Sequence, residues 1–257
     1  MEIHRVPIAN PESTEPIEVW PMADLHVGDP GFCESKLKFD LKRVSENPRA
    51  YIILLGDLIN NATKGSVSNV YDELMSPTDQ GYYVTSLLEP VREKIVGIVS
   101  GNHERRSRKE VDLDPDEIIA DKLKVPYFGD EALVKFTFGN WARAGQPISY
   151  LFYGTHGSGG GRRVGGKANR LEDLFGIVPG CDVYLRAHTH QPLHVPQACY
   201  LPNSGKQVAH LHEYHLVSTG SYLNRAGYAV THEYKPLPMG CPIITLSGRE
   251  RHVEVRK

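Results

Sequence analysis

The chain has 257 residues, 40% of them hydrophobic, and its 29 Lys and Arg nearly balance 31 Asp and Glu, for a formal net charge of −2. This length and composition exclude a disordered chain, a collagen-like repeat and a small disulfide-bonded scaffold. The near-neutral charge also argues against a protein that coats a polyanion. The 12 His beside only 4 Cys need an explanation from their positions.

The first half of the chain alternates short apolar runs with segments of helical character. The apolar runs predict strands over Pro16–Ala23, Tyr51–Leu55 and Ile95–Val99. Apolar spacing or a proline at the first helical position predicts helices over Lys36–Val44, Tyr82–Glu93 and Pro115–Leu123. Each predicted strand ends in a short polar loop, as expected for an α/β protein.

The second half is richer in strands. Apolar runs predict strands over Leu133–Phe138, Ile148–Tyr153, Asp182–Leu185, His215–Ser218 and Ile243–Leu246. Ala168–Phe175 has the spacing of a helix. Neither a low-complexity linker nor an internal repeat separates the halves, so we expect one α/β domain with mixed sheets over residues 1–257.

Nothing in the sequence indicates export or membrane insertion. The N-terminal segment lacks the apolar core of a secretory signal, and the longest apolar run, Tyr51–Leu55, is far shorter than a membrane span. The four cysteines, which form no Cys-x-x-Cys pair, are Cys33, Cys181, Cys199 and Cys241. We therefore expect a soluble, cytoplasmic protein with reduced thiols and no membrane partner.

Residues typical of metal sites come directly after five of the predicted strands. In chain order they are Asp24 and His26, Asp57 with Asn60, Asn102 and His103, His156, and His188 and His190. Any one of these is commonly a turn or an exposed imidazole. Because ligands of α/β proteins gather at the carboxyl ends of strands, the whole set favours a site at one edge of a sheet.

In these motifs the chain resembles the calcineurin-like metallophosphoesterase superfamily, whose pattern runs D-x-H, G-D-x-x-N/D, G-N-H-D/E, a lone H and G-H-x-H. Here they read Asp24-Leu-His26, Gly56-Asp57-Leu-Ile-Asn60, Gly101-Asn102-His103-Glu104, Gly154-Thr-His156 and Ala187-His188-Thr-His190. The departure is Ala187 in place of Gly, where the added methyl could shift the backbone. The resemblance covers residues 24–190 and implies an α/β (α+β) fold, a four-layer αββα sandwich of two mixed β-sheets flanked by helices.

The resemblance also implies a dinuclear metal site at the strand-end loops. It assigns one metal to Asp24, His26 and His190, the other to Asn102, His156 and His188, and makes Asp57 the bridge. Imidazole and oxygen ligands suit two divalent transition-metal ions, Mn²⁺ first and otherwise Fe, Zn, Co or Ni. Two such ions outweigh the two carboxylates and a bridging hydroxide by one positive charge, which attracts phosphate. An Asp in place of Asn102 would cancel this surplus.

The implied reaction is hydrolysis of a phosphoester, in which the metal-bridging hydroxide attacks phosphorus and His103 assists the leaving group. Asn60 and Glu104 fit a role in orienting the ligands, and the alternative for them is loop hydrogen bonding and a solvated acid. These assignments use five of the 12 His, and the others have no assigned role.

Two basic stretches adjoin the motifs, Arg105–Lys109 after His103 and Gly157–Lys167 after His156. We expect both on loops beside the metals. The candidate contacts to further substrate phosphates are Arg105, Arg106, Arg162, Arg163 and Lys167, and the alternative is solvated loop charge. The basic stretches favour a phosphodiesterase that acts on nucleic acid (DNA or RNA) or on nucleotides, and a nuclease is among the candidates. A phosphomonoesterase or phosphatase is the alternative. Phosphoprotein phosphatases are disfavoured, because Asn60-Asn61-Ala62 replaces their Asp-Arg-Gly.

Two further segments have weaker functional interpretations. Gly161-x-x-x-x-Gly166-Lys167 approaches a phosphate-binding loop, but Ala168 stands at its Ser/Thr position, so a nucleotide-binding NTPase is a remote alternative. Tyr222, Arg225 and Tyr228 could stack on or contact a substrate, although a structural turn explains them better. Oligomeric state, metal identity and the natural ester do not follow from the sequence.

Overall fold

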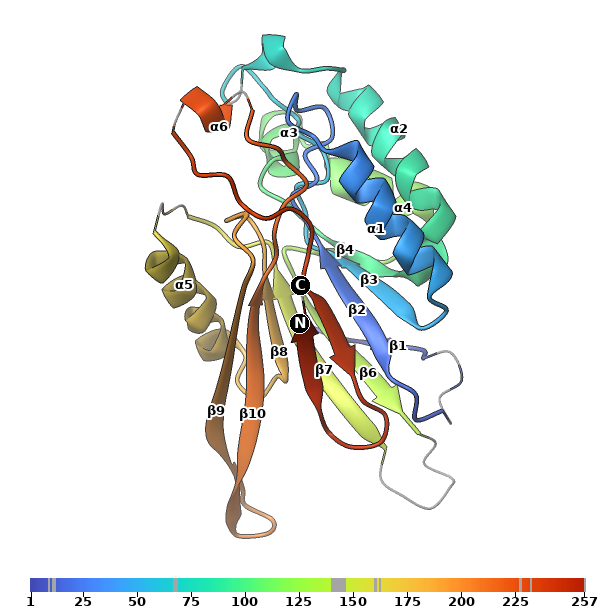
Figure 1. Ribbon diagram of the computed structural model, residues 1–257, viewed down its shortest axis with the longest axis vertical. Helices are drawn as coiled ribbons and strands as arrows, with labels where there is room; N and C mark the ends of the chain where they lie inside the picture. Colours follow the sequence, from blue (N-terminus) through green and yellow to red (C-terminus); the bar gives the residue numbers. More distant parts are fainter. Residues whose placement is uncertain are drawn as a thin grey trace.

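Two mixed β-sheets pack face to face, and helices cover the outer face of each, so the predicted αββα sandwich is confirmed (Figure 1). The computed structural model describes residues 1–8, 10, 13–66, 69–139, 147–159, 161, 163–226, 228–231 and 233–256. Within these residues, no helix combines the length and apolar character that a membrane span requires. That residues 1–257 form one domain stays a prediction.

The first sheet has the strand order β12-β11-β2-β3-β4-β5. Its strands are β2 (Ile17–Met22), β3 (Ala50–Leu54), β4 (Ile95–Val99), β5 (Tyr127–Gly129), β11 (Ile243–Leu246) and β12 (Val253–Arg256). Strands β2 to β5 run parallel, and β11 is antiparallel to β2. The helices on its outer face are α1 (Glu34–Glu46), α2 (Pro77–Leu88) and α4 (Pro115–Leu123), whose apolar sides form one core with the sheet.

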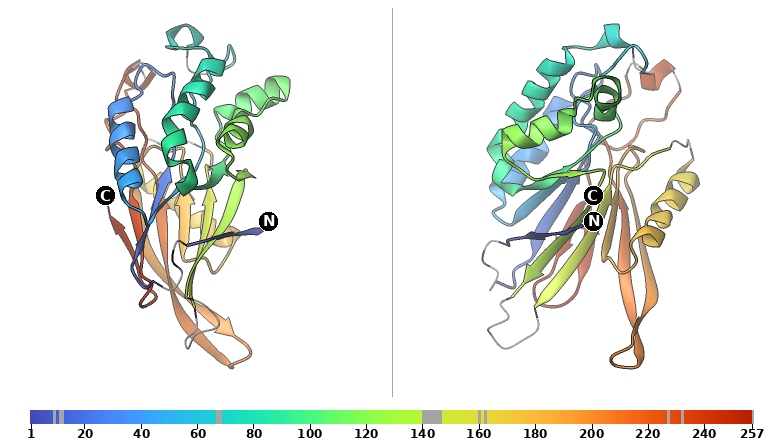
Figure 2. Two further views of the ribbon diagram at one scale, coloured as in Figure 1. Left: turned by 90° about the vertical axis from the view of Figure 1, so that its right-hand side faces the viewer. Right: turned by 180° about the vertical axis from the view of Figure 1, so that it is seen from behind.

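The second sheet has the order β1-β6-β7-β8-β10-β9. Its strands are β1 (Ile3–Val6), β6 (Glu131–Phe138), β7 (Ile148–Thr155), β8 (Val183–Arg186), β9 (Leu193–Asn203) and β10 (Val208–Ser218). Helix α5 (Val164–Ile177) packs Leu171 and Leu174 on its outer face. Figure 2 shows α5 on the side of the molecule opposite α1, α2 and α4.

The central strands are apolar throughout because both of their faces are buried. In β3, Ile52 and Leu54 point toward the helices, whereas Tyr51 and Ile53 enter the core between the sheets. Alternate side chains of a strand lie on opposite faces, so a strand inside a sandwich needs an apolar residue at every position. The continuous apolar run that predicted this strand is thus explained by two separate cores.

Three expectations about local structure differ from what the structure shows. The basic stretch Arg105–Lys109 lies in a helix, α3 (Glu104–Val111), and Lys167 lies in the first turn of α5 instead of a loop. Helix α3 is short and almost entirely charged, so it has no apolar stripe to reveal it, although Arg, Lys and Glu favour helices. The helix predicted over Tyr82–Glu93 ends earlier, because Pro90 leads into the 3₁₀ segment η2 (Glu89–Lys94).

The remaining described helical segments are short, η1 (Val70–Asp72) before α2 and α6 (Tyr228–Thr231) near the end of the chain.

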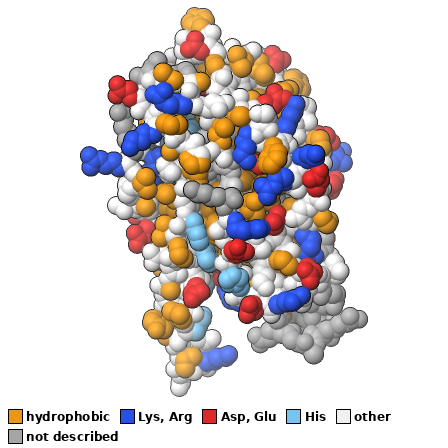
Figure 3. Space-filling view, in the orientation of Figure 1, with side chains coloured by type: hydrophobic (Ala, Val, Ile, Leu, Met, Phe, Trp, Pro, Cys, Tyr) orange, Lys and Arg blue, Asp and Glu red, His pale blue; other side chains and the backbone are white. Residues whose placement is uncertain are grey.

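The hairpin of β9 and β10 extends beyond the sandwich and carries some of the unassigned histidines (Figure 3). His212 is buried and its Nε2 lies 2.9 Å from the carbonyl oxygen of Cys181. His194 and His215 stack with ring centroids 5.2 Å apart and with facing nitrogens 2.9 Å apart. Contacts within the hairpin and with the turn before β8 therefore account for these three residues.

The carboxyl ends of β2, β3, β4, β7 and β8 meet at one end of the sandwich. The strands come from both sheets, so the site predicted at one edge of a sheet lies at the end that the two sheets share. The amide of His188 after β8 donates to a carboxylate oxygen of Asp24 after β2, across the two sheets (3.1 Å). Ala187 is fully buried in the core between the sheets, which gives its methyl a packing partner.

The turns after β3 and β4 touch through two glycines. A Cβ on Gly56, whose φ is +80°, would lie 2.4 Å from the backbone of Gly101. We expect Gly56→Ala to lower the free energy of unfolding by about 2 kcal/mol or more, through steric conflict and a strained φ. Urea unfolding would measure this change.

Gly81→Ala is the matched control, because nothing lies within 4 Å of a Cβ at this position of α2. It should raise stability by up to about 1 kcal/mol, the helix propensity difference between Gly and Ala. Equal effects of the two substitutions would contradict the contact between the strand ends.

Candidate metal centre

Five of the predicted metal ligands hold left-handed backbone conformations at the ends of their strands. They are Asp24 (φ 52°), His26 (50°), Asp57 (51°), His188 (69°) and His190 (55°). Such conformations cost non-glycine residues on the order of 1–3 kcal/mol each and cluster at functional sites. Five such residues lie around one point, which indicates that the surrounding structure holds their backbones in the conformations that direct these side chains toward it.

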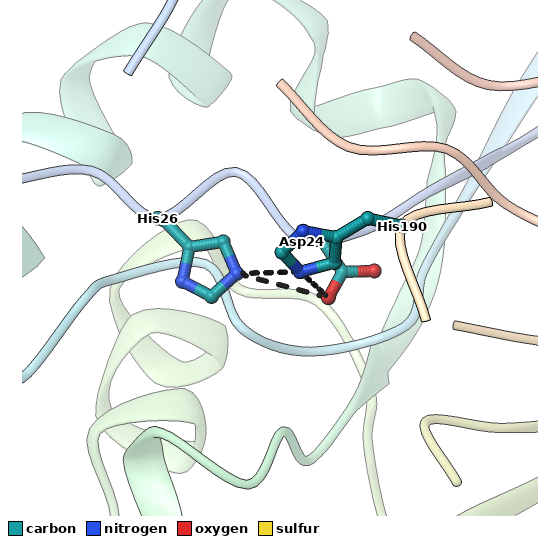
Figure 4. A group of neighbouring side chains, drawn as sticks. All are labelled: Asp24, His26 and His190. Atoms are coloured by element: carbon teal, nitrogen blue, oxygen red, sulfur yellow. Dashed lines mark hydrogen bonds and ion pairs between the residues drawn. The ribbon is translucent and has the colours of Figure 1, made fainter. Parts of the chain in front are cut away.

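Asp24, His26 and His190 form the first cluster (Figure 4). Nε2 of His190 lies 3.1 Å from Oδ1 of Asp24 and 3.2 Å from Nε2 of His26. Oδ1 of Asp24 is buried and has no hydrogen-bond partner within the described residues. An orphaned carboxylate oxygen facing two imidazole nitrogens is a donor set that fits a divalent transition metal.

The second cluster is built around His156. Its Nδ1 lies 2.6 Å from the carbonyl oxygen of Leu55, which can only accept, so Nδ1 carries the proton. Its Nε2 then faces two further acceptors, Oδ1 of Asn102 at 2.9 Å and Oδ2 of Asp57 at 3.3 Å. The lone pair of Nε2 and those of the two oxygens repel one another, so a cation has to lie between them, either a proton or a metal ion. A ring nitrogen of His188 completes this group, and the ligand atoms of Asp57, His156 and His188 all lie within 4.8 Å of one another.

Asp57 connects the two clusters. Its Oδ2 lies 3.8 Å from Nε2 of His26 in the first cluster and 3.3 Å from Nε2 of His156 in the second. Its other oxygen accepts the backbone N–H of His103 at 2.9 Å, which fixes the carboxylate plane. This position between the clusters is the one a bridging ligand requires.

The carboxylates and imidazoles of the site shift one another's pKa values. Burial alone would raise the pKa of Asp57 and of Asp24, but the neighbouring histidines outweigh it and hold both pKa values well below their usual range. Burial lowers the pKa of His156, yet the charges of the two aspartates outweigh it and raise that pKa to about 9. In the metal-free protein a proton on His156 therefore does what a metal ion would otherwise do.

His103 lies beside the clusters and turns one ring nitrogen toward them. Its Nδ1 is 2.7 Å from the carbonyl oxygen of Asn60, and its ring meets that of His26 edge to face at 4.4 Å. Burial lowers the pKa of His103 to about 3, against the opposing charge of Asp57. Nε2 of His103 lies 3.7 Å from Oδ2 of Asp57 and so faces the centre as a neutral imidazole nitrogen.

Glu104 and Asn60 form hydrogen bonds with predicted metal ligands or with the backbone beside them. The carboxylate of Glu104 accepts the backbone N–H groups of Asp57 (3.1 Å) and Ile59 (2.9 Å). Glu104 is fully buried, and burial with the nearby charge of Asp57 raises its pKa to about 7. Oδ1 of Asn60 lies 3.3 Å from Nδ1 of His26. A solvated acid is thus excluded for Glu104, and both side chains contact a ligand or its backbone.

The basic residues predicted to contact substrate differ in what they touch. The guanidinium of Arg105 donates to the carbonyl of Ser100 and pairs with Asp130. Arg106 donates to the carbonyls of Asn60 and Asn61. The Lys167 ammonium donates to the carbonyl of Thr189, between the two ligands of the last motif, at 3.0 Å. Arg163 is exposed at the start of α5, and Arg162 lies outside the described residues.

The structure favours the structural alternative for both of the weaker functional interpretations. Among the described residues of the segment 161–167, Val164 to Lys167 form the first turn of α5, so they are helical and not part of a loop that would cradle a phosphate in an NTPase. Tyr222 is fully buried and donates to Asp40, and Arg225 donates to the carbonyl of Tyr234, as a structural turn requires. The side chain of Tyr228 lies outside the described part of the chain.

Sequence reasoning missed a group of residues behind Asn60. Glu73 accepts from Nδ2 of Asn60, Gln80 accepts from the backbone of Asn61, and the Asn61 side chain donates to the carbonyl of His103. Glu73 directly follows η1 and Gln80 lies in α2, and neither is part of a motif, so no local pattern could have revealed them.

The chain is similar to several known proteins. A family model described as calcineurin-like phosphoesterase matches residues 22–192. No curated protein sequence gives a significant match. Similar solved structures include Vps29 of Chaetomium thermophilum (13% identity, 93% of this chain and 94% of that chain, TM-score 0.43) and the calcineurin-like phosphoesterase YfkN of Bacillus subtilis (12%, 94% and 90%, TM-score 0.44). Another is the nuclease MPE of Pseudomonas putida (12%, 92% and 86%, TM-score 0.38).

The raised pKa of His156 predicts how the stability of the metal-free protein depends on pH. The pKa rises from 6.5 to about 9 on folding, so its contribution is complete below about pH 6.5 and is lost as pH rises to 9. Glu104, with a pKa of about 7, acts mostly below the window from pH 7 to 9. We expect the urea midpoint of chelator-treated protein to fall across that window.

Added Mn²⁺ should flatten this pH profile, because the metal takes the place of the proton. His156→Gln should also make the profile less steep without metal, although not flat, because Asp24 and Asp57 outweigh burial and raise the pKa of His26 as well. An unchanged slope in chelator-treated His156→Gln would contradict the assignment of the proton to His156.

Proposed function

The chain belongs to the calcineurin-like phosphoesterase family, and from this premise we propose that it is a metal-dependent phosphodiesterase acting on nucleotides or nucleic acid. The observation that carries the proposal is the position of Asp57, whose Oδ2 faces imidazole nitrogens of both clusters. This arrangement supports two divalent ions, with Mn²⁺ as the first choice for mixed imidazole and oxygen ligands. Asp24, His26 and His190 would hold one ion, and Asn102, His156 and His188 the other.

When bound, the two metals would activate a water molecule and neutralise charge on the phosphate oxygens. The chain itself supplies orientation and proton handling. The bond from His103 Nδ1 to Asn60 leaves Nε2 available to hydrogen-bond or protonate the leaving oxygen. An approaching phosphate anion would raise the pKa of this buried imidazole and so favour the protonated form that a leaving group needs.

Lys167 supports an extended substrate over a simple monoester. Its ammonium has three donors and makes one described hydrogen bond, to Thr189 between His188 and His190. The remaining donors sit beside the ligands and can contact a second phosphate or a sugar. The four free cysteines fit the cytoplasmic location that we also propose.

A substrate panel tests the proposal. It comprises p-nitrophenyl phosphate, bis-p-nitrophenyl phosphate, cyclic nucleotides, and labelled single- and double-stranded DNA and RNA, each with Mn²⁺. We expect hydrolysis of diesters at a higher kcat/KM than the monoester, and complete loss with chelator. A strong preference for the monoester would indicate a phosphatase, and activity that survives full metal removal would overturn the mechanism.

Variants of Asp57 and His103 separate metal binding from chemistry. Asp57→Asn should abolish both Mn²⁺ binding and hydrolysis, because the ligand shared by both clusters loses its charge. His103→Asn should lower kcat by about 10²–10⁴-fold while Mn²⁺ affinity, measured by calorimetry, stays unchanged. Since Nε2 of His103 also lies within reach of a metal near His26 and Asp57, a large loss of Mn²⁺ affinity would make it a ligand instead.

Lys167→Met should raise KM for a dinucleotide by about 10-fold, the loss of one charge-assisted hydrogen bond, with little change in kcat. Steady-state kinetics on the dinucleotide and on bis-p-nitrophenyl phosphate would measure it. Lys206→Met, at the tip of the β9–β10 hairpin, is the control and should change neither constant. A fall in kcat of about 10-fold with an unchanged KM would contradict a role in substrate binding.

A further inference from the structure

Asn60 joins a proposed ligand to the proposed catalytic histidine. Its side-chain oxygen lies 3.3 Å from Nδ1 of His26, and its backbone carbonyl accepts from Nδ1 of His103 at 2.7 Å. Its backbone N–H donates to the carbonyl of Val27, next to His26. Asn60 therefore contacts both histidines, His26 through its side chain and His103 through its backbone.

The orientation of the Asn60 amide is determined by Glu73. Nδ2 of Asn60 donates to Oε1 of Glu73 at 2.5 Å. A carboxylate accepts and cannot donate, so the amide must turn its NH₂ toward Glu73 and its oxygen toward His26. Nδ1 of His26 then has to be the protonated nitrogen, which leaves the lone pair on Nε2, the atom that faces Asp24 and His190.

Glu73 is itself held in place by Gln80. Nε2 of Gln80 donates to Oε2 of Glu73 and to the carbonyl of Met75, while Oε1 of Gln80 accepts the backbone N–H of Asn61. The backbone donor and the backbone acceptor allow only one orientation of the Gln80 amide. Gln80 is fully buried, and it packs so closely on Gly28 that a Cβ there would lie 2.3 Å from Nε2. Oε2 of Glu73 thus receives an N–H from a fixed partner, and Oε1 is left to accept from Asn60.

The segment that carries Glu73 is tied to the loop that carries His26. The backbone N–H of Leu74 donates to the carbonyl of Gly28 at 2.9 Å, two residues after His26. The carboxylate is therefore fixed relative to the imidazole by backbone bonds as well as by side chains.

We infer that Glu73 is a positioning residue that selects, through Asn60, the His26 tautomer able to bind a metal through Nε2. The inference rests on the proposed function for its catalytic meaning, because it concerns a ligand of that site. It predicts that the charge of Glu73 matters, and not merely its volume, since only an obligate acceptor enforces the orientation of Asn60.

Glu73→Gln is the informative substitution because it is nearly isosteric. The new side chain offers one oxygen and one NH₂, and the fixed NH₂ of Gln80 claims the oxygen. The NH₂ then faces Asn60, whose amide must flip and direct its own NH₂ at His26. Nδ1 of His26 becomes an acceptor, and its proton moves to Nε2, where it blocks the metal. Mn²⁺ affinity should fall by about 10–100-fold, the usual effect of losing a ligand's hydrogen-bond partner.

The double variant Glu73→Gln with Asn60→Asp supplies the rescue. The carboxylate introduced at position 60 would accept from the new amide at position 73 with one oxygen and from Nδ1 of His26 with the other, which restores the original tautomer. We expect Mn²⁺ affinity to return to within a few-fold of the unsubstituted protein. Glu110→Gln is the matched control, because Glu110 lies on α3 and its carboxylate also accepts a hydrogen bond, from Thr63. This substitution should change neither the Mn²⁺ affinity nor the tautomer of His26.

The primary measurement is long-range ¹H–¹⁵N NMR of the metal-free 257-residue chain, at a pH high enough to keep His26 neutral, with the His26 signals assigned from a His26→Gln spectrum. It reports which ring nitrogen carries the proton and does not depend on catalysis. Calorimetry with Mn²⁺ gives the affinities, and urea midpoints show whether each variant remains folded. A His26 tautomer that is unchanged in folded Glu73→Gln would overturn the inference.

The outcomes distinguish this inference from the proposed function. If the tautomer shifts and is rescued but no phosphodiester is cleaved, the positioning role holds and the proposed function fails. If diesters are cleaved while the tautomer and Mn²⁺ affinity ignore Glu73, the function holds and the inference fails. If Glu73→Gln loses Mn²⁺ affinity and the double variant does not regain it, Glu73 has a general structural role, and the inference is also rejected.

Discussion

A buried carboxylate, Asp57, has to be neutralised, and the rest of the structure is arranged around that requirement. A charged group removed from water is stable only when paired and hydrogen-bonded. Here three imidazole rings surround one oxygen, while the amide of His103 donates to the other. These rings follow β2 and β4 of one sheet and β7 of the other, so the ends of both sheets have to meet at Asp57. The contact of Gly56 with Gly101 brings the turns after β3 and β4 together within the first sheet.

The imidazoles in turn need defined tautomers, and their second nitrogens provide them. Nδ1 of His156 faces the carbonyl of Leu55, and Nδ1 of His103 faces that of Asn60. Backbone carbonyls can only accept, so each ring turns its lone pair toward the centre. His26 is different, because its partner is a side-chain amide that could flip. That difference is why the carboxylate of Glu73 acquires a function that no backbone group performs for this ring.

The basic residues near the site divide into internal supports and available donors. Arg105 and Arg106 are engaged by backbone carbonyls and by Asp130, so their charge stabilises the turns that carry the ligands. Lys167 lies beside the last motif with donors beyond its one described hydrogen bond. A count of arginines in the sequence therefore overstates the positive surface that a substrate would meet, because side chains that bond internally are already partly desolvated and occupied.

The order of the amino acids was enough to predict the family, the αββα sandwich and most of the central strands, because burial on both faces leaves a continuous apolar run. It also indicated which ligand types follow which strands. It could not reveal the charged helix α3, whose apolar stripe is missing, or the edge strands β1, β9 and β12, whose exposed residues dilute the pattern. Three-dimensional packing was needed to show that both sheets build the site and that Glu73 meets Asn60, because such pairings satisfy buried polar groups across the chain, and no local periodicity records them.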